Sequence, residues 1–388
     1  MQPVNEVYAS YGTTVFEVMS RLAVEHGSIN LGQGFPDGNG PADVRRAAAE
    51  ALEDRPNQYP PMLGLPELRQ AVAAHAGRFY GLEVDWQREV MVTSGATEAL
   101  ASCLFGLLNP GDEAVLFEPL YDSYLPVVRR AGATPRFVRL EPPGWELSEA
   151  ELAAAFSERT KLVLLNTPMN PTGKVFDRDE LALVADLVLR HDAYAVCDEV
   201  YEHLCFDGCR HVPLMTLPGM RERCLRIGSA GKTFSLTGWK VGYVTAPAEL
   251  LGVVAKAHQF LTFTTPPNLQ RAVAYGLGKD DAYFADLAAD MERKRDLLTA
   301  GLERAGFAAA ACRGTYFVNA DFRPLGFNGD DVAFCRHITT EAGVTAIPVS
   351  AFYHDAGTGH FARFCFCKED EVLAEAVARL ARHFGASG

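Results

Sequence analysis

The chain has 388 residues, of which 48% are hydrophobic and 22% are charged, and its formal net charge at pH 7 is −13. This composition is typical of a globular protein of two or three domains, and the acidic charge disfavours nucleic acid as a general partner, because phosphate binding requires a basic face. No stretch approaches the ~18 consecutive apolar residues of a membrane span, so we expect no association with a membrane.

The N-terminal residues Met-Gln-Pro-Val-Asn-Glu contain neither a basic segment nor an apolar core, so we expect no secretion signal and a cytoplasmic protein. The nine cysteines are then expected to be reduced thiols. Two close pairs, Cys205 with Cys209 and Cys365 with Cys367, are too isolated from other ligands to form a convincing zinc set. The sequence therefore predicts no metal site.

The N-terminal segment begins with a predicted amphipathic helix over about residues 14–26. It is followed by Leu-Gly-Gln-Gly-Phe-Pro-Asp at positions 31–37. Gly32 and Gly34 there either make a simple turn or free the backbone for close approach to another group. Further on, the sequence Asn-Gln-Tyr-Pro-Pro predicts a rigid, extended loop that presents Tyr59.

From Glu89 onward, short apolar segments alternate with helical ones, and this rhythm predicts a parallel sheet covered by helices on both faces. The predicted strands are Val90–Thr93, Ala114–Phe117, Lys161–Leu165, Ala193–Cys197 and Cys224–Gly228. The predicted helices of this part cover about 67–80, 94–108 and 177–191. In an open α/β sheet, ligands bind at the carboxyl ends of the strands. The polar residues that follow those ends are Thr97, Tyr121, Asn170, Asp198 and Lys232.

The first of these strands leads into Ser-Gly-Ala-Thr-Glu at positions 94–98. We expect Ser94 to cap the following helix, while Gly95 and Ala96 leave its first backbone N–H groups open. An exposed helix N-terminus directly after a strand is suited to bind a phosphate. No Gly-x-Gly-x-x-Gly follows any strand, so a dinucleotide is not favoured.

The segment Ile-Gly-Ser-Ala-Gly-Lys-Thr-Phe at positions 227–234 places Lys232 among small residues, between apolar segments. Desolvation there, together with a second cation such as Lys240, would lower the pKa of the amine and make it a nucleophile able to form a Schiff base. Ser229-x-x-Lys232 also matches the spacing of penicillin-recognising enzymes, but their other elements are missing. A P-loop would require glycine where the chain has Arg226.

After about residue 278 the pattern changes, first to a long predicted helix over 281–304. Strands over 315–319 and 361–366 and a C-terminal helix over about 369–383 follow. This mixture predicts a second, smaller α+β domain. The chain would thus consist of residues 1–40 as an arm that joins the small domain, residues 41–278 as the large domain and residues 279–388 as the small one.

One cofactor accounts for all the polar groups at the predicted sheet edge: a pyridine ring that carries a phosphate, a phenolic oxygen and an aldehyde. Its phosphate would be held at Gly95, Ala96, Thr97, Ser229 and Lys240. Asn170 and Tyr201 can donate to the phenolic oxygen, and the carboxylate of Asp198 would keep the ring nitrogen protonated. Lys232 would bind the aldehyde, and Tyr121 would pack on the face of the ring.

With these residues, the chain resembles the class I/II, fold-type I aminotransferases, which depend on pyridoxal 5′-phosphate. The resemblance covers about residues 10 to 385. It depends on Asn-Pro-Thr-Gly at 170–173, Asp-Glu-Val-Tyr at 198–201 and Ser229-x-x-Lys232 followed by Lys240. The fold it implies is a large cofactor-binding domain with a mostly parallel sheet flanked by helices, plus a smaller α+β domain.

Within the family, two branches share sequences with the chain. The kynurenine, glutamine and methionine aminotransferases are similar at 31–37, 227–234, Ala-Ile-Pro-Val-Ser 346–350 and Arg-Phe-Cys-Phe 363–366. The N-succinyldiaminopimelate aminotransferases are similar at 57–61, 121–124, 199–204 and 323–326.

The resemblance also implies roles for individual residues. Lys232 would carry the cofactor and move the substrate's α-proton, with Asp198 and Tyr201 as its catalytic partners. Arg363 would bind the substrate α-carboxylate through a bidentate pair. The remaining expected substrate and cofactor contacts are Asn170, the Gly34 backbone, Phe16, Tyr121 and, from the neighbouring subunit of a homodimer, Tyr59. Many relatives have arginine in place of Lys240, although the kynurenine branch has lysine; a lysine keeps the charge without the fork geometry.

The expected activity is transfer of an amino group from an L-amino acid, such as methionine, glutamine or an aromatic or kynurenine-like donor, to a 2-oxo acid by a ping-pong mechanism. Two alternatives remain open, an N-succinyldiaminopimelate aminotransferase and a cysteine-S-conjugate β-lyase on the same scaffold. A non-enzymatic regulator would need an additional DNA-binding segment, and no stretch of the sequence offers one.

Overall fold

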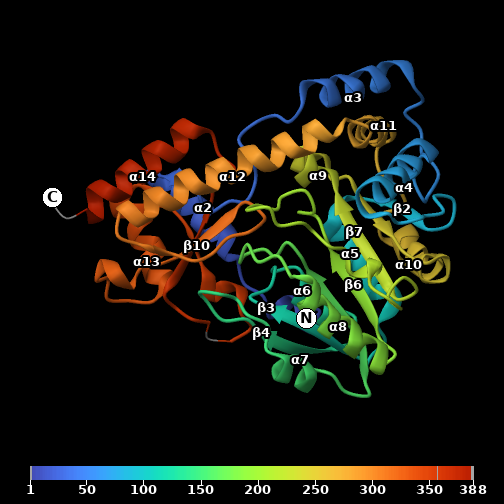
Figure 1. Cartoon of the computed structure of the whole chain (residues 1–388), viewed down its shortest axis with the longest axis horizontal. Helices are drawn as coiled ribbons and strands as arrows, with labels where there is room; N and C mark the ends of the chain where they lie inside the picture. The colour runs from blue at the N-terminus through green and yellow to red at the C-terminus, as the bar shows by residue number, and fades with distance from the viewer. Residues whose placement is uncertain (1, 356, 386–388) are drawn as a thin grey trace.

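The computed structural model describes residues 2–355 and 357–385, and its elements fall into a larger and a smaller part (Figure 1). The smaller part, orange and red in Figure 1, lies on the left, and the long helix α12 (Asp281–Arg304) runs from it toward the larger part. No helix of the described residues combines the length and apolarity needed to cross a membrane. All nine cysteines are free thiols.

The larger part is built on a sheet that, within the described residues, has seven strands in the order β2-β8-β7-β6-β5-β3-β4. All run parallel except β8, which is antiparallel to both of its neighbours. The mostly parallel sheet is thus confirmed. The strands are β2 (Val90–Thr93), β3 (Glu113–Glu118), β4 (Thr134–Arg139), β5 (Thr160–Asn166), β6 (Tyr194–Asp198), β7 (Cys224–Ser229) and β8 (Gly242–Thr245).

Helices cover this sheet because its central strands are buried along their whole length and expose no polar face. Asp177 begins α8 with a capping box. The helices of the larger part are α3 (Ala42–Asp54), α4 (Pro66–Tyr80), α5 (Gly95–Leu107), α6 (Tyr124–Arg130), α7 (Glu149–Ala155), α8 (Arg178–Arg190), α9 (Ala230–Thr233), α10 (Ala248–Leu261) and α11 (Pro267–Leu277), with 3-10 turns η1 (Leu214–Thr216) and η2 (Thr237–Trp239).

The smaller part contains an antiparallel sheet in the order β12-β13-β10-β9 and a parallel pair, β1 with β11. Through this pair the N-terminal segment joins the C-terminal part of the chain, whereas α1 packs against α6. The strands are β1 (Ile29–Asn30), β9 (Ala308–Ala309), β10 (Phe317–Asp321), β11 (Val344–Thr345), β12 (Ile347–Pro348) and β13 (Phe361–Cys365). The other elements are α1 (Glu6–Ala9), α2 (Val15–His26), α13 (Asp331–His337), α14 (Asp370–Phe384), the 3-10 turns η3 (Arg323–Leu325) and η5 (Val349–Phe352), and the π-helical turn η4 (Ile338–Ala342).

Two local predictions need correction. The strand expected over 315–319 begins only at Phe317, because Thr315 has a φ of 67°, which is incompatible with a strand. Ser94 occupies the N-cap position of α5, but its side chain makes no capping hydrogen bond. Its hydroxyl lies 3.2 Å from Thr265 Oγ1, while its backbone N–H donates to Glu98 Oε2.

The parallel strands bring their carboxyl ends to one edge of the sheet. Asn166, at the end of β5, lies opposite Asp198, at the end of β6. The Asn166 side chain donates a hydrogen bond of 2.8 Å to the Asp198 carbonyl oxygen. The two strand ends are therefore locked in register beside the loop that follows each of them, and α9 follows the end of β7 at the same edge.

Candidate active site

A cavity of about 440 Å³ lies at this sheet edge, between the larger part and residues of the smaller one. Its volume is in the range of small-molecule sites. Of the predicted site residues, Tyr59 alone does not line it. Those that do are Phe16, Gly34, Gly95, Ala96, Thr97, Tyr121, Asn170, Asp198, Tyr201, Ser229, Lys232, Lys240 and Arg363.

Lys232 presents its amine to this cavity from α9. Its Nζ donates a hydrogen bond of 2.7 Å to Tyr316 Oη, and that hydroxyl donates one of 2.7 Å to the Gly34 carbonyl oxygen. The amine also lies 5.5 Å from the centre of the Tyr201 ring. Burial lowers the pKa of Lys232 below its ordinary value. The amine is thereby closer to the neutral form, which attacks carbonyl carbons.

Asp198 provides a buried carboxylate at the cavity wall. It accepts a hydrogen bond of 2.7 Å from Tyr124 Oη, and burial raises its pKa. Among residues 2–355 and 357–385, no lysine, arginine or histidine forms an ion pair with it. A carboxylate in this state favours a cationic ligand group, such as a protonated pyridine nitrogen, because a nearby positive charge offsets the cost of its burial.

The start of α5 and Lys240 together form a place for an anion. Gly95 has a φ of 74°, and a Cβ there would lie 3.3 Å from Lys240 Cε and 3.4 Å from Lys240 Nζ. The backbone of Gly95 also approaches Gly242 so closely that a Cβ on Gly242 would lie 2.7 Å from the Gly95 carbonyl carbon. Because Gly95 and Gly242 have no side chains, the Lys240 amine can approach the first N–H groups of α5. A phosphate binds well at such a place.

Arg363 is a buried cation on β13. Its Nη1 donates to Asn170 Oδ1 at 2.9 Å and its Nη2 to the Gly32 carbonyl oxygen at 2.8 Å, while Nε is buried without a partner among the described residues. The guanidinium lies 3.9 Å from the centre of the Phe317 ring. Burial lowers its pKa to about 10, so it remains charged at neutral pH. Its unused N–H groups suit a carboxylate that enters the cavity.

Comparison with known proteins agrees with this geometry. The family model "Aminotransferase class I and II" matches residues 27–380. The chain belongs to this family. It is therefore an enzyme that depends on pyridoxal 5′-phosphate and uses amino acids and 2-oxo acids as substrates.

Several relatives of this aminotransferase match over nearly their whole length. A probable N-succinyldiaminopimelate aminotransferase of Mycobacterium tuberculosis is 45% identical, with 95% of this chain and 96% of the relative covered. The methionine aminotransferase of Escherichia coli is 40% identical, with 95% of each chain covered. Human kynurenine–oxoglutarate transaminase 1 is 38% identical, with 91% and 92% covered. The solved structure of the M. tuberculosis N-succinyldiaminopimelate aminotransferase superposes with a TM-score of 0.95 over 98% of this chain and 100% of that one.

The aminotransferase cavity fits its cofactor in chemical terms. Asp198 offers a ring nitrogen a buried carboxylate that has no ion-pair partner in the described part of the chain, and Lys232 offers an amine for an aldehyde. The start of α5 with Lys240 suits the phosphate, and Tyr201 lines the cavity with a hydroxyl that suits a phenolic oxygen. Each functional group of pyridoxal 5′-phosphate thus has a partner of matching chemistry in this chain.

Tyr59 lies outside the cavity and is 82% exposed, with its ring centre 5.4 Å from that of Phe263. The structure therefore does not bring it to the site formed by its own chain. Its expected contact with the cofactor of a neighbouring subunit stays a prediction.

Some residues at the site were not predicted from the sequence. They are Tyr124, which bonds to Asp198; Tyr316, which bonds to Lys232; and Asp122, which lines the cavity. Tyr124 and Asp122 lie in the segment that follows β3, so their position at the sheet edge was a usable signal. Tyr316 lies 84 residues after Lys232 in a different part of the fold, and no local pattern marks it.

Proposed function

We propose that this aminotransferase takes its amino group from an L-amino acid with an uncharged side chain, namely methionine, glutamine or an aromatic or kynurenine-like donor. The cationic side chains that line the described cavity are Lys232, Lys240 and Arg363, and each has a place in binding the cofactor or the substrate α-carboxylate. The aromatic residues Phe16, Tyr121 and Phe317 line the cavity as well. This aromatic lining, which offers no further cation, is the observation that carries the proposal.

The residues of the site would act as follows. Arg363, oriented by Asn170 and Gly32, binds the substrate α-carboxylate with its remaining N–H groups. When bound, pyridoxal 5′-phosphate supplies an electron-accepting ring that stabilises negative charge at the substrate α-carbon. The carboxylate of Asp198, oriented by Tyr124, keeps a positive charge at the ring nitrogen.

Lys232 would carry out the proton transfers. Its amine would be the general base that takes the proton from the substrate α-carbon. Tyr316 holds the amine by a hydrogen bond and is itself anchored on the Gly34 carbonyl, so the two residues fix the position of Nζ relative to the bound substrate. The same amine gives up the proton later in the cycle.

A second candidate substrate is N-succinyl-LL-diaminopimelate, and the 45% identity with the M. tuberculosis relative favours it. Such a substrate has a distal carboxylate that requires a cation. The lining of this chain's cavity instead contains the carboxyl group of Asp122, which opposes a second anion. A β-lyase acting on cysteine S-conjugates would use the same cofactor residues. Only its substrate would differ, by carrying a leaving group on the β-carbon.

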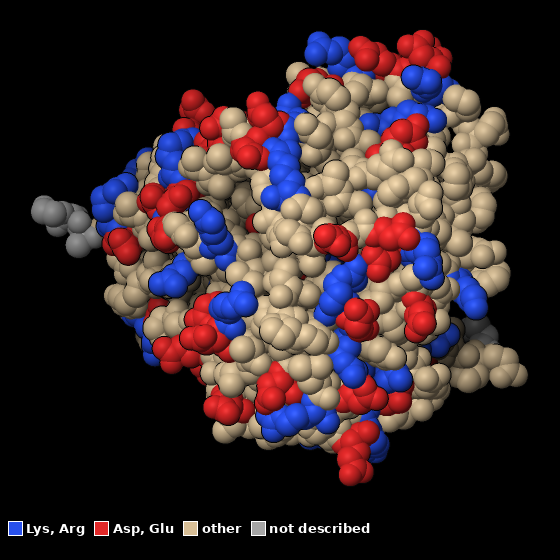
Figure 2. All heavy atoms as spheres, turned by 45° about the vertical axis from the view of Figure 1, so that its right-hand side comes forward, with Lys and Arg blue, Asp and Glu red and all other residues tan. Residues whose placement is uncertain are grey.

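We further propose a cytoplasmic homodimer with shared active sites. The free thiols suit a reducing compartment. Large apolar side chains are exposed near α10 and α11, on the right-hand side of Figure 1. Figure 2 turns that side forward and shows an area with few charged side chains there. The exposed apolar residues are Tyr59, Phe260, Leu261, Phe263 and Tyr275. A surface of this kind is typical of a subunit interface, and an interface there would carry Tyr59 toward a partner.

The decisive test is a single-turnover reaction of the holoenzyme with methionine, glutamine, kynurenine or N-succinyl-LL-diaminopimelate, followed by the cofactor's absorbance. Fast conversion of the cofactor to its amine form by one of the first three compounds is expected. Fast conversion by the succinylated compound alone would refute the proposal in favour of the second candidate. A cysteine S-conjugate that releases pyruvate faster than it converts the cofactor would identify a β-lyase.

A further inference from the structure

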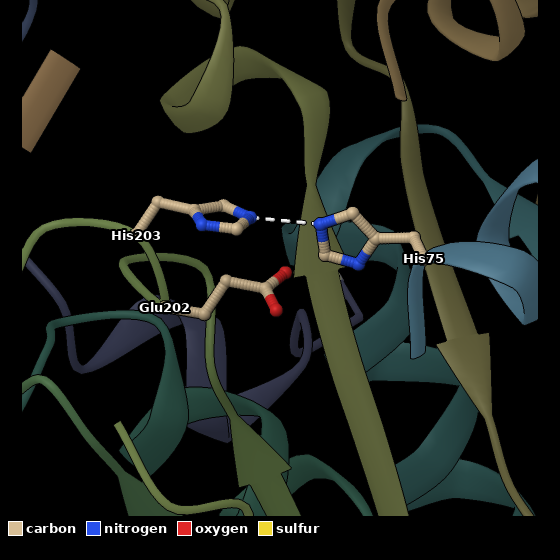
Figure 3. A group of neighbouring side chains, drawn as sticks. All are labelled: His75, Glu202 and His203. Carbon is tan, nitrogen blue, oxygen red and sulfur yellow. Dashed lines mark hydrogen bonds between the residues drawn. The ribbon is translucent and has the colours of Figure 1, made fainter. Parts of the chain in front are cut away.

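Two histidines and a glutamate outside the active-site cavity meet at one point of the larger part. His75 belongs to α4, while Glu202 and His203 lie in the loop after β6. His75 Nε2 and His203 Nε2 are 2.8 Å apart. Figure 3 shows the two rings facing each other through these nitrogens, with the Glu202 carboxylate beside them. One ligand atom from each of the three residues lies within 4.8 Å of the others.

The surroundings hold these side chains in place. His75 is 2% exposed, and Glu202 is buried as well. Phe79 packs against both imidazoles, with ring centres 4.7 Å from His75 and 4.9 Å from His203. Phe284 lies 4.4 Å from the His203 ring. This packing keeps the two ring nitrogens close to each other.

Two buried carboxylates and one arginine lie beside the histidines. Glu199 and Glu202 are both buried, and both pair with the same cation, Arg226. Glu199 has a further neighbour, because His211 Nε2 lies 2.9 Å from its Oε2, whereas Glu202 shares Arg226 with Glu199.

Glu202 also keeps an oxygen available. Tyr80 Oη donates to Glu202 Oε2 at 2.6 Å, and Arg226 bonds to the same oxygen. The other oxygen, Oε1, has only a hydrogen bond of 3.4 Å from Tyr243 Oη, which is long for an O–H donor. A carboxylate oxygen in this state can accept a stronger partner.

We propose that His75, Glu202 and His203 bind a divalent transition-metal ion of the zinc type. Two imidazole nitrogens and one carboxylate oxygen form a common zinc ligand set, with water as the fourth ligand. Tetrahedral zinc separates two bound nitrogens by about 3.3 Å, so the nitrogens, now 2.8 Å apart, would move apart by about 0.5 Å and both rings would turn to point their lone pairs at the ion. The ion would also add positive charge beside two buried carboxylates that share one arginine. His203 is the less buried of the two histidines and marks the side from which the ion enters.

The metal would be structural. None of its ligands lines the active-site cavity, but Glu202 directly follows Tyr201, which does. The ion therefore connects α4 to the loop that carries Tyr201. A second cluster, Glu118 with His354 and Asp355, is less suited to a metal because His354 and Asp355 are exposed and Asp355 already pairs with Arg139.

The test begins with holoenzyme treated with a chelator and titrated with Zn²⁺ or Co²⁺. We expect one equivalent to bind, to raise the melting temperature and, for Co²⁺, to give the visible spectrum of a tetrahedral site. The variants His75→Asn and His203→Asn should each weaken binding by about 100-fold or more, because each loses a direct ligand. The matched control, His26→Asn, removes an exposed histidine of α2 and should bind as tightly as the unaltered enzyme.

The site is refuted if the folded enzyme binds no Zn²⁺ or if both ligand variants retain its affinity. It is also refuted if the bound Co²⁺ shows thiolate charge-transfer bands that disappear in Cys365→Ser, since that result would place the ion at the cysteines. Crystals of the unaltered enzyme soaked in Zn²⁺ give a measurement that needs no variant. An anomalous peak about 2.0–2.2 Å from both Nε2 atoms supports the site, and a peak elsewhere overturns it.

Discussion

The Nζ of Lys232 and the hydroxyl of Tyr316 form a hydrogen bond of 2.7 Å between the two parts of the fold. Lys232 follows the last residue of β7 by three positions, and Tyr316 precedes β10. Because Tyr316 also donates to the Gly34 carbonyl oxygen, a single hydroxyl links the lysine to the N-terminal segment. The position of the lysine amine thus depends on how the two parts pack together.

Removing this hydroxyl should slow the reaction more than it destabilises the fold. We expect Tyr316→Phe to lower kcat by about 10- to 100-fold, because the amine loses the group that orients it for proton transfer. The loss of stability should be about 1 kcal/mol, as for an ordinary buried hydrogen bond. Tyr353→Phe is the matched control, since Tyr353 Oη donates to the Leu140 carbonyl oxygen at 3.0 Å away from the cavity. Equal kcat values for the two variants would contradict a role of Tyr316 in positioning.

Lys232 itself should be indispensable. The variant Lys232→Ala loses both the amine that holds the cofactor and the general base, so its turnover should fall by about 10⁴-fold or more. Steady-state transamination and the absorbance of the bound cofactor measure the two losses separately. The control Lys161→Ala removes a lysine that lies over the Tyr194 ring on β6. It should leave both the transamination rate and the absorbance of the bound cofactor unchanged. Transamination by Lys232→Ala at the unaltered rate would overturn the mechanism.

Gly95 offers a test of the phosphate site with a closely matched control. An alanine at position 95 would have its Cβ 3.3 Å from Lys240 Cε and would strain a backbone with a φ of 74°. We expect Gly95→Ala to weaken cofactor binding by about 10-fold or more, because the methyl group occupies the space between the helix start and the cation. Gly81 has a φ of 66° and nothing within 4 Å of a Cβ. Gly81→Ala should therefore show a similar backbone strain, of about 1 kcal/mol, with unchanged cofactor affinity.

Arg363 should determine the affinity for every substrate carboxylate. Arg363→Lys keeps the charge but cannot offer parallel N–H groups, and its amine would be more costly to bury. We expect kcat/KM to fall by about 100-fold for amino acids and 2-oxo acids alike, mainly through KM. In the control, Arg323→Lys, the exposed side chain on η3 pairs with Asp321, and the kinetics should not change. A loss confined to a single substrate would show that Arg363 contacts a side chain instead of the α-carboxylate.

The stability of the fold should depend on acid through Glu113. A hydrogen bond of 2.7 Å from Ser157 Oγ and the Arg159 guanidinium hold the pKa of this buried carboxylate below its ordinary value. The folded chain therefore keeps the charge at a pH where the unfolded chain takes up a proton. This contribution is complete above pH 4.5, the ordinary pKa, and is lost as the pH falls through the lowered one.

Chemical denaturation between pH 3 and 7 measures this dependence. Glu113→Gln should reduce the free energy of unfolding by about 1–3 kcal/mol at neutral pH and flatten its decline in acid. The control Glu158→Gln removes the same charge from an exposed position nearby. Its free energy of unfolding should fall in acid as steeply as that of the unaltered enzyme. If the free energy of unfolding falls equally steeply in acid for the unaltered enzyme and for Glu113→Gln, the role of Glu113 is refuted.

The sequence by itself determined the larger sheet and much of the active site. Apolar strands that alternate with helices form a parallel sheet, and parallel strands place their carboxyl ends at one edge. Residues directly after those ends, such as Asp198 and Lys232, must therefore lie near one another whatever the details of packing. For the same reason the chain pattern was sufficient to predict a cofactor site there.

The tertiary structure alone decided the contacts between segments far apart in the chain. Tyr316 meets Lys232 although 84 residues separate them. His75 and His203 meet although 128 residues separate them. Periodicity reports the face of an element that is buried, but not the partner it is buried against. Such partners depend on how complete elements pack, so no local pattern in the sequence reveals them.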